Sequence, residues 1–259
     1  MRGRTVPLSR ARKMVGELLH FAAGVPTVPV QRRMNLAPVA AARRACTERP
    51  SWTVLFSKAF SLVAVEFPQL RQAYCKFPLP HLYEYPSSVA HVAVERLYEG
   101  EPTVFGLLVK DIEHKSLSQI AALVQRARAA PLDEIVCFRR ALRTAGWPRP
   151  VRRVAWWFGL NLGRQRANYF GTFAVTVYSG LGAESLHPLT PLTTSLNYGV
   201  IAPDGTVDVR LIYDHRVLDG ATVARALARL EHVLNTTIRS EIATTAVPLP
   251  LDGPDHAAA

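Results

Sequence analysis

The sequence has few cysteines: Cys46, Cys75 and Cys137 are three in 259 residues, and they lie far apart. An odd number at this spacing fits neither a disulfide framework nor a zinc-binding pattern, so we expect a reducing compartment, the cytoplasm, and no metal. Long apolar runs are also missing, since none reaches the roughly 18 residues of a membrane-spanning helix. The N-terminus is basic, but its apolar part is interrupted by Glu17 and His20, which is unlike a signal peptide.

Acidic residues are scarce relative to basic ones. The chain has 20 Asp and Glu against 31 Lys and Arg, a formal net charge of +11 at pH 7. This balance is typical of an arginine-rich soluble protein, and it also favours an anionic partner such as a phosphate-bearing cofactor, nucleic acid or an acidic membrane. No zinc finger, RNA-binding aromatic signature or G-x-x-x-x-G-K-[ST] loop is present, so we do not expect a nucleic-acid partner.

Helices and strands are both present in the apolar pattern. Helical spacing is found over residues 6–22, 52–66, 116–129 and 220–239, with Ser116 or Ser118 as the N-cap of the third helix. Extended or alternating segments are found over 28–36, 88–98, 103–112 and 171–179, and 194–202 and 206–214 flank a Pro-Asp-Gly turn as an antiparallel hairpin. This mixture predicts an α/β (α+β) domain.

The stretch "DHRVLDG", residues 214–220, places His215 where a strand ends and a helix is about to begin. A side chain in that position can project from a rigid element into a cleft, as a catalytic base would. His215 could equally be a hydrogen-bonded structural histidine. Asp219 is a candidate N-cap of the following helix, or a brace for the local backbone. No third ligand accompanies these residues, so a metal site is disfavoured.

"DHRVLDG" resembles the D-H-R-x-x-D-G signature of the catalytic domain of 2-oxoacid dehydrogenase dihydrolipoamide acyltransferases. Chloramphenicol acetyltransferase shares a looser form of it, usually with a second histidine where this chain has Asp214. Other segments are similar to the same family, in the same order. They are "VPLSRARKMVGELL", "VPTVPVQRRMNLAPVAAAR", "WTVLFSKAFSLVAVEFPQL", "LLVKDIEHKSLSQIAALV" and "GTFAVTVYSGLGA". The resemblance covers residues 6 to about 240.

The resemblance implies a two-layer sandwich, a mixed sheet with helices packed on it, and acyl transfer between thiols. His215 would be the general base that takes the proton of coenzyme A or dihydrolipoamide, and Thr176 would donate to the oxyanion. Asp219 would be a mainly structural member of the site, paired with Arg12, with Arg216 as further support. The family's active site lies between subunits, so the resemblance also implies a homotrimer. Coenzyme A would be a substrate, and no metal is implied.

Three features depart from the family. The resemblance starts at about residue 6, so we expect one catalytic domain over residues 1–245 and a flexible tail over 246–259, with any lipoyl group supplied by another protein. A segment at about 131–168 is inserted, and from Arg139 to Arg166 it holds eight arginines and no acid, interleaved with tryptophans. The tail lacks the family's apolar terminal segment, which disfavours a large cage.

The inserted segment has several interpretations. The preferred one is a helical hairpin packed on its own domain, with tryptophans inward and arginines solvated. It could instead contact an anionic membrane surface, cover the acyl channel or bind an anionic substrate. The alternative to an enzyme is therefore an inactive scaffold or binding protein of the same fold that uses this segment on a membrane or protein partner.

Overall fold

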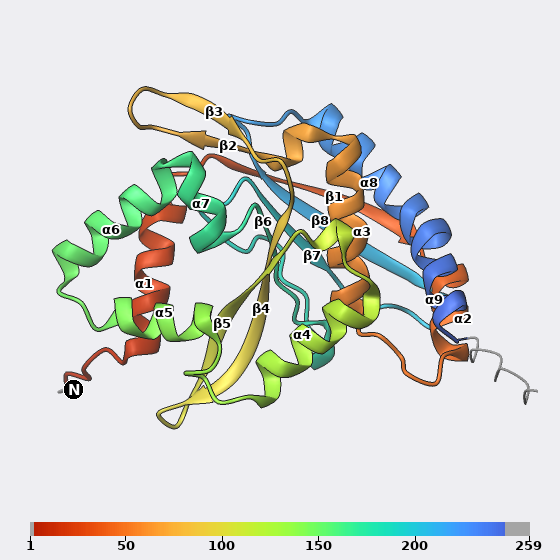
Figure 1. The fold of residues 1–259 in the computed structure, drawn as a ribbon, viewed down its shortest axis with the longest axis horizontal. Helices are drawn as coiled ribbons and strands as arrows, with labels where there is room; N and C mark the ends of the chain where they lie inside the picture. Colours follow the sequence, from red (N-terminus) through yellow and green to blue (C-terminus); the bar gives the residue numbers. More distant parts are fainter. Residues whose placement is uncertain (1–2, 247–259) are drawn as a thin grey trace, which may run out of the picture.

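The computed structural model describes residues 3–246, and a six-stranded mixed sheet forms its centre (Figure 1). The strand order is β1-β8-β7-β6-β4-β5, in which β6 pairs in parallel with β4 and β7 and the other pairs are antiparallel. The strands are β1 (Thr27–Asn35), β4 (Val89–Tyr98), β5 (Glu101–Lys110), β6 (Phe173–Val175), β7 (Thr194–Tyr198) and β8 (Thr206–Asp214). A separate hairpin joins β2 (Gln72–Cys75) to β3 (His81–Glu84).

The antiparallel pairing of β7 and β8 confirms the hairpin predicted around Pro-Asp-Gly. Asp204 accepts hydrogen bonds from the amide and hydroxyl of Thr206, at 2.9 and 2.7 Å. Gly205 has a φ of +86°, and a Cβ there would lie 2.5 Å from the Ala37 nitrogen. Only glycine fits this left-handed position beside the start of the next helix.

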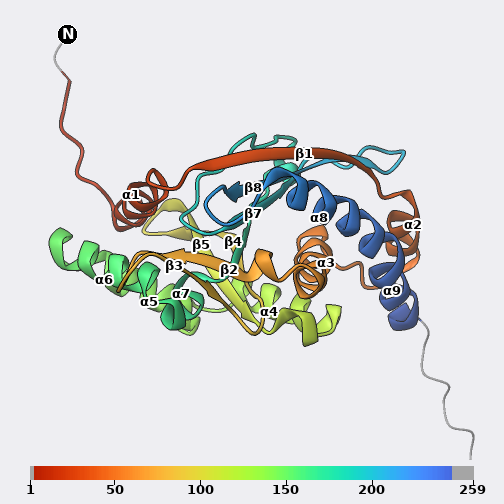
Figure 2. The same ribbon diagram turned by 90° about the horizontal axis from the view of Figure 1, so that it is seen from above.

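One face of the sheet is covered by α3 (Trp52–Glu66), α4 (Leu117–Ala129) and α8 (Gly220–Val233), as Figure 2 shows. The helix α3 is apolar on nearly every side and lies in the middle of this layer. Its aromatic side chains stack on the sheet: Phe56 is 4.2 Å from Tyr198, and Phe60 is 4.7 Å from Phe173, between ring centroids. Burial of these rings stabilises the two-layer arrangement.

α2 (Ala37–Ala45) and α9 (Arg239–Ala246) pack together beside this layer, whereas α1 (Arg10–Ala22) contacts β5. Ser116 rather than Ser118 caps α4, in a capping box with Gln119. The helix predicted to end at about 239 runs as α8 to Val233, and a π-helical turn from Leu234 to Ile238 joins it to α9.

The strand predicted over 171–179 is shorter than expected. β6 ends at Val175, because its pairing with the neighbouring strands β4 and β7 does not continue beyond that residue. The Thr176 amide still donates to the Leu196 carbonyl at 3.2 Å, but the Thr176 carbonyl accepts from the side-chain Nδ2 of Asn197 at 2.7 Å. A side chain therefore replaces a strand amide at this point. The expected tail beyond residue 246 lies outside the described residues.

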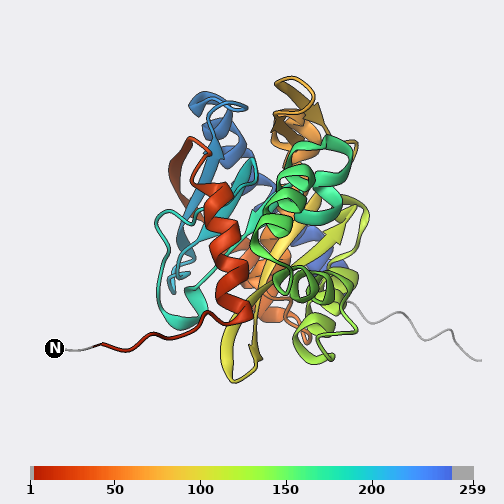
Figure 3. The ribbon, with the colours of Figure 1, turned by 90° about the vertical axis from the view of Figure 1, so that its left-hand side faces the viewer.

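The inserted segment forms three helices: α5 (Val136–Ala145), α6 (Arg149–Asn161) and α7 (Gly163–Phe170). α5 and α6 pack beside α1, as the side view shows (Figure 3), and α7 contacts β4 and β5. Trp156 stacks on Phe21 at 5.9 Å and contacts Phe170 at 4.9 Å, so the expected packing of tryptophan on the domain is present.

The prediction that the arginines of this segment are all solvated is wrong. Arg152 and Arg166 are buried. Arg152 bonds the carboxylate of Glu17 at 2.9 Å, which joins α6 to α1. Arg166 donates to the carbonyls of Tyr74, Leu160 and Pro191. Each buried guanidinium thus has several acceptors, which lower the cost of burying it.

Candidate active site

His215 follows directly after the last residue of β8. Its amide donates to the Pro26 carbonyl at 3.0 Å, which fixes the backbone beside the start of β1. The imidazole is exposed in the protomer and lies edge-on to the Tyr213 ring, at 5.6 Å between centroids. The predicted position of His215 at a strand end is confirmed, and the residue is exposed there.

A hydrogen bond fixes the tautomer of His215. The Nδ1–H donates to the Leu218 carbonyl at 3.0 Å. In the neutral ring the proton is therefore on Nδ1, and Nε2 carries a lone pair. Within the described residues Nε2 has no hydrogen-bond partner, so it is available to accept a proton from an incoming group.

Asp219 caps the helix α8, which was one of its two predicted roles. Its carboxylate accepts from the Thr222 amide at 2.8 Å and from the Thr222 hydroxyl at 3.2 Å. The bond from the Thr222 amide is the main cause that holds the pKa of Asp219 below its ordinary value. A cap in this position fixes both the start of α8 and the loop that carries Leu218, the acceptor for His215.

Arg12 does not pair with Asp219 within the protomer, so that prediction is wrong for a single chain. Arg12 bonds Glu101 at 2.8 Å instead. The physical reason is the position of α1, which lies beside the outer end of the β4–β5 hairpin, where Arg10 also bonds Tyr98. The cap position of α8 lies at the other side of the sheet.

Arg216 supports the loop of His215 through a different partner, Asp214. The guanidinium forms a two-pronged ion pair, with Nε at 2.9 Å from Oδ1 and Nη2 at 2.7 Å from Oδ2. It also lies over the Tyr74 ring, 4.3 Å from the centroid. Both residues that flank His215 in the chain are therefore held in place.

Sequence reasoning missed Arg166 as a member of this region. Burial lowers the pKa of Arg166, while the negative charge of Asp214 acts in the opposite direction. The sequence held no signal that separates Arg166 from the other arginines of the inserted segment, because its burial depends on the packing of α7 against β2.

Thr176 lies just beyond β6 and is half-buried. Phe173 and Val175 belong to the core under the helices, so the alternation of the chain places Thr176 on the other face. On that face of β7, Ser195 Oγ and Asn197 Oδ1 are buried and have no hydrogen-bond partner within the described residues. Unpaired buried polar atoms of this kind indicate a missing partner, such as water, ligand or another protomer.

His215 and Thr176 do not meet within one protomer. Val175 is level with Leu196, and Asn197, the next residue of β7, pairs with Arg210. Thr176 is thus level with Arg210, five residues before His215, which is about 17 Å along an extended strand. A site that uses both residues needs each from a different copy of the chain.

The described residues contain no group of three or more His, Cys, Asp or Glu side chains that could hold a metal ion. Nor does any helix among residues 3–246 have the length and apolar character to cross a bilayer.

No family model matches the sequence, and no curated protein matches it. Solved structures do match. A probable dihydrolipoamide acetyltransferase from Listeria monocytogenes 4b F2365 has a TM-score of 0.66 at 16% identity, over 95% of this chain and 98% of that chain. The dihydrolipoamide acetyltransferase of Azotobacter vinelandii, studied for the role of a serine, a histidine and an asparagine in its catalytic mechanism, gives 0.65 at 19%, over 93% and 94%. The truncated catalytic core of the 2-oxoacid dehydrogenase multienzyme complex from Thermoplasma acidophilum gives 0.65 at 18%, over 90% and 99%.

These matches confirm the predicted fold: this chain has the two-layer fold of dihydrolipoamide acetyltransferase catalytic cores over nearly its full described length. At this level of identity the likeness shows the fold alone, because one fold can carry many functions.

Proposed function

We propose that the protein is an acyltransferase that moves an acyl group between coenzyme A, or a lipoyl thiol carried by another protein, and an acceptor. The observation that carries the proposal is the state of His215. Its Nδ1 proton is directed to the Leu218 carbonyl, and its Nε2 lone pair is open at a rigid strand end. The fold shared with dihydrolipoamide acetyltransferases supports the same reaction class.

The proposed step is a thiol exchange at a thioester. Nε2 of His215 takes the proton from the attacking S–H, and the thiolate forms a bond to the carbonyl carbon. The tetrahedral oxyanion then collapses, the bond to the other sulfur breaks, and the departing thiolate recovers the proton from the imidazolium. Imidazole suits this exchange because its ordinary pKa, about 6.5, is near neutrality and within about two units of a thiol's.

Asp219, Asp214 and Arg216 position the base in this proposal without touching substrate. In the Azotobacter vinelandii enzyme the histidine and the asparagine named for catalysis are four residues apart, as His215 and Asp219 are here. Asp219 caps α8 and so holds the Leu218 loop. The Asp214–Arg216 pair holds the opposite side of the histidine.

The oxyanion donor in this proposal is the Thr176 hydroxyl of a neighbouring protomer in a homotrimer. Two observations support a site that is shared between two protomers. The residues are about 17 Å apart along one chain, and the face that bears Thr176 holds the unpaired Ser195 Oγ and Asn197 Oδ1. A hydroxyl already in place lowers the energy of the developing oxyanion without reorganisation.

The test is His215→Ala, assayed by release of free thiol from a panel of acyl-CoA donors. Because the imidazole is exposed, the variant should fold, and transfer should fall by about 10²- to 10⁴-fold. The matched control is His232→Ala, an exposed histidine of α8 remote from the strand end. Full transfer by the His215 variant would remove the mechanism.

One observation favours the second candidate, a scaffold that contacts an anionic membrane surface. Along α6, Val151, Val154 and Phe158 are exposed at helical spacing, with fractions of 52, 56 and 42%. Arginines lie on the same helix, as in helices that bind the interface of anionic bilayers. This candidate would be supported if the protein shows no acyl transfer and co-sediments with phosphatidylglycerol vesicles. The Val154→Asp variant should then lose that co-sedimentation.

A further inference from the structure

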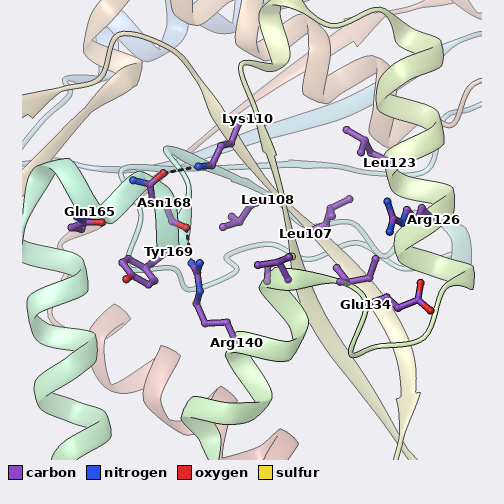
Figure 4. Close-up of a pocket in the computed structure, with 13 residues that line it drawn as sticks. Leu107, Leu108, Lys110, Leu123, Arg126, Glu134, Arg140, Gln165, Asn168 and Tyr169 are labelled. Atoms are coloured by element: carbon purple, nitrogen blue, oxygen red, sulfur yellow. Dashed lines mark hydrogen bonds between the residues drawn. The ribbon is translucent and has the colours of Figure 1, made fainter.

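A cavity of about 550 Å³ lies at the outer edge of the sheet, beside β5 (Figure 4). It is open to solvent and lined by β5, α4, α5 and α7, and the last two of these helices belong to the inserted segment. Its volume is within the usual range for small-molecule sites, about 300–1,000 Å³. In the strand order, β5 lies four positions from β8, the strand that His215 follows. At about 4.8 Å between neighbouring strands, the two are about 19 Å apart.

The floor of the cavity is apolar. Leu107 and Leu108 come from the edge strand β5, Ile135 and Val136 from the start of α5, and Leu123 from α4. Leu123 and Val136 expose 37 and 57% of their surface. An apolar group placed on them would remove this surface from water, which is favourable.

The rim of the cavity is cationic. Lys110 donates to Asn168 Oδ1 at 2.7 Å, and Arg140 donates to the Asn168 carbonyl at 3.0 Å, so both are held by neutral acceptors. Arg140 also lies over the Tyr169 ring, 4.6 Å from the centroid. The side chain of Arg126 has no hydrogen bond or ion pair with any described residue. Figure 4 shows Lys110 and Arg140 on one side of the cavity and Arg126 on the other.

These cations are not neutralised within the cavity. Glu134 is the one acid among the lining residues, against three cations, and no ion pair within residues 3–246 joins it to them. A neighbouring hollow of about 260 Å³ is lined by Val136, Arg139, Arg140 and Arg143, which extends the positive surface along α5. Clefts lined by one sign of charge attract ligands of the other sign.

We propose that this cavity binds an amphiphile with an anionic head: an apolar chain on the leucine floor, and a carboxylate or phosphate held by the cationic rim that includes Arg126 and Arg140. Arginine is suited to either head because its planar donors match two oxygens at once. The inserted segment supplies Arg140, Ile135 and Val136, so the proposal also gives this segment a function. It is independent of acyl transfer at His215.

Cys137 provides a readout within the cavity. It lines the site and is half-buried, while Cys46 and Cys75 are buried. Alkylation of Cys137 by iodoacetamide, followed by mass spectrometry of its peptide, therefore reports occupancy without any measure of turnover. The probes are decanoate and decyl phosphate below their micelle concentrations, with decanol and inorganic phosphate as the uncharged and chain-free counterparts.

We expect decanoate or decyl phosphate to slow the alkylation of Cys137, and the better of the two identifies the head group. Arg126→Gln and Arg140→Gln should each weaken binding by calorimetry about tenfold, the loss of one charge-assisted hydrogen bond. Arg126→Gln breaks no existing bond, so it should fold. The matched control is Arg128→Gln, exposed on the same helix but outside the cavity.

Three results would overturn the proposal. The first is that neither decanoate nor decyl phosphate binds. The second is that decanol or inorganic phosphate protects Cys137 as well as the charged amphiphiles do. The third is that Arg128→Gln weakens binding as much as Arg126→Gln. The first removes the site, the second removes one half of the recognition, and the third reduces it to net charge.

Discussion

Arg216 and Asp214 form a two-pronged ion pair across the histidine that separates them in the chain, with nitrogen–oxygen distances of 2.9 and 2.7 Å. The Asp214 side chain is 1% exposed, whereas that of Arg216 is 27% exposed and stacked on Tyr74. This buried carboxylate pairs with Arg216, and its negative charge also acts on the buried guanidinium of Arg166.

Asp214→Asn should lower the free energy of unfolding by about 3 kcal/mol, because it leaves two partly desolvated cations that repel each other. Urea denaturation measures the effect. Asp208→Asn is the matched control, since Asp208 lies on the same strand and the same face without a side-chain bond to any described residue. Equal losses in the two variants would contradict the role given to Asp214.

The ion pair of Glu17 and Arg152 should contribute far more to stability than that of Arg12 and Glu101. Side-chain exposures are 4 and 8% in the first pair and 29 and 60% for Glu101 and Arg12 in the second. Glu17→Gln should therefore cost about 3–5 kcal/mol, because it strands a buried guanidinium. Glu101→Gln should cost much less, because solvent screens this exposed pair. Thermal unfolding of both variants checks the difference, and a loss in Glu17→Gln no larger than in Glu101→Gln would show that α6 is not held to α1 in this way.

His91 should make the protein less stable as the pH falls below about 6.5, its ordinary pKa. Its Nδ1–H donates to the Phe170 carbonyl at 2.8 Å, and its ring occupies the space where a Gly106 side chain would lie. Burial is the main cause that lowers the pKa of His91 in the folded chain. The unfolded chain therefore binds the proton first, and stability is full above the unfolded pKa and falls with pH below it, by at most about 1.4 kcal/mol per pH unit.

The measurement for His91 is urea denaturation between pH 5 and pH 7.5. His91→Gln, which does not titrate, should have a shallower pH dependence than the unaltered protein, whatever its absolute stability. An unchanged slope in that variant would assign the pH dependence to other groups.

Much of the fold was predictable because strong local signals agree with it. The apolar spacing of 52–66 gave the bounds of α3, and Pro-Asp-Gly gave the β7–β8 hairpin. The end of β6 was not predictable, because Thr176 has strand propensity and the strand ends there through a bond from the Asn197 side chain, a partner distant in sequence.

The candidate site was predictable in part. The position of His215 at a strand end, and Asp219 as a helix cap, follow from neighbours within a few residues. The partner of Arg12 and the burial of Arg166 depend on where α1 and α7 pack, which no local pattern determines. The cavity beside β5 was missed for the same reason, since it is built from four elements distant in sequence.

Mixed oligomers should recover activity that neither of two variants has alone. If each site takes His215 from one copy and the Thr176 hydroxyl from another, His215→Ala and Thr176→Val homo-oligomers are both impaired. Removal of a hydroxyl donor typically costs about 10²- to 10³-fold. Unfolding the two variants together and refolding the mixture would form some sites with both residues intact, and transfer should rise well above the mean of the parents. The control is the same mixture assembled from separately folded variants without exchange. The strand register keeps the base and the hydroxyl about 17 Å apart within one chain, so a common site has to form across protomers. A mixture no more active than its parents would mean that no such shared site exists.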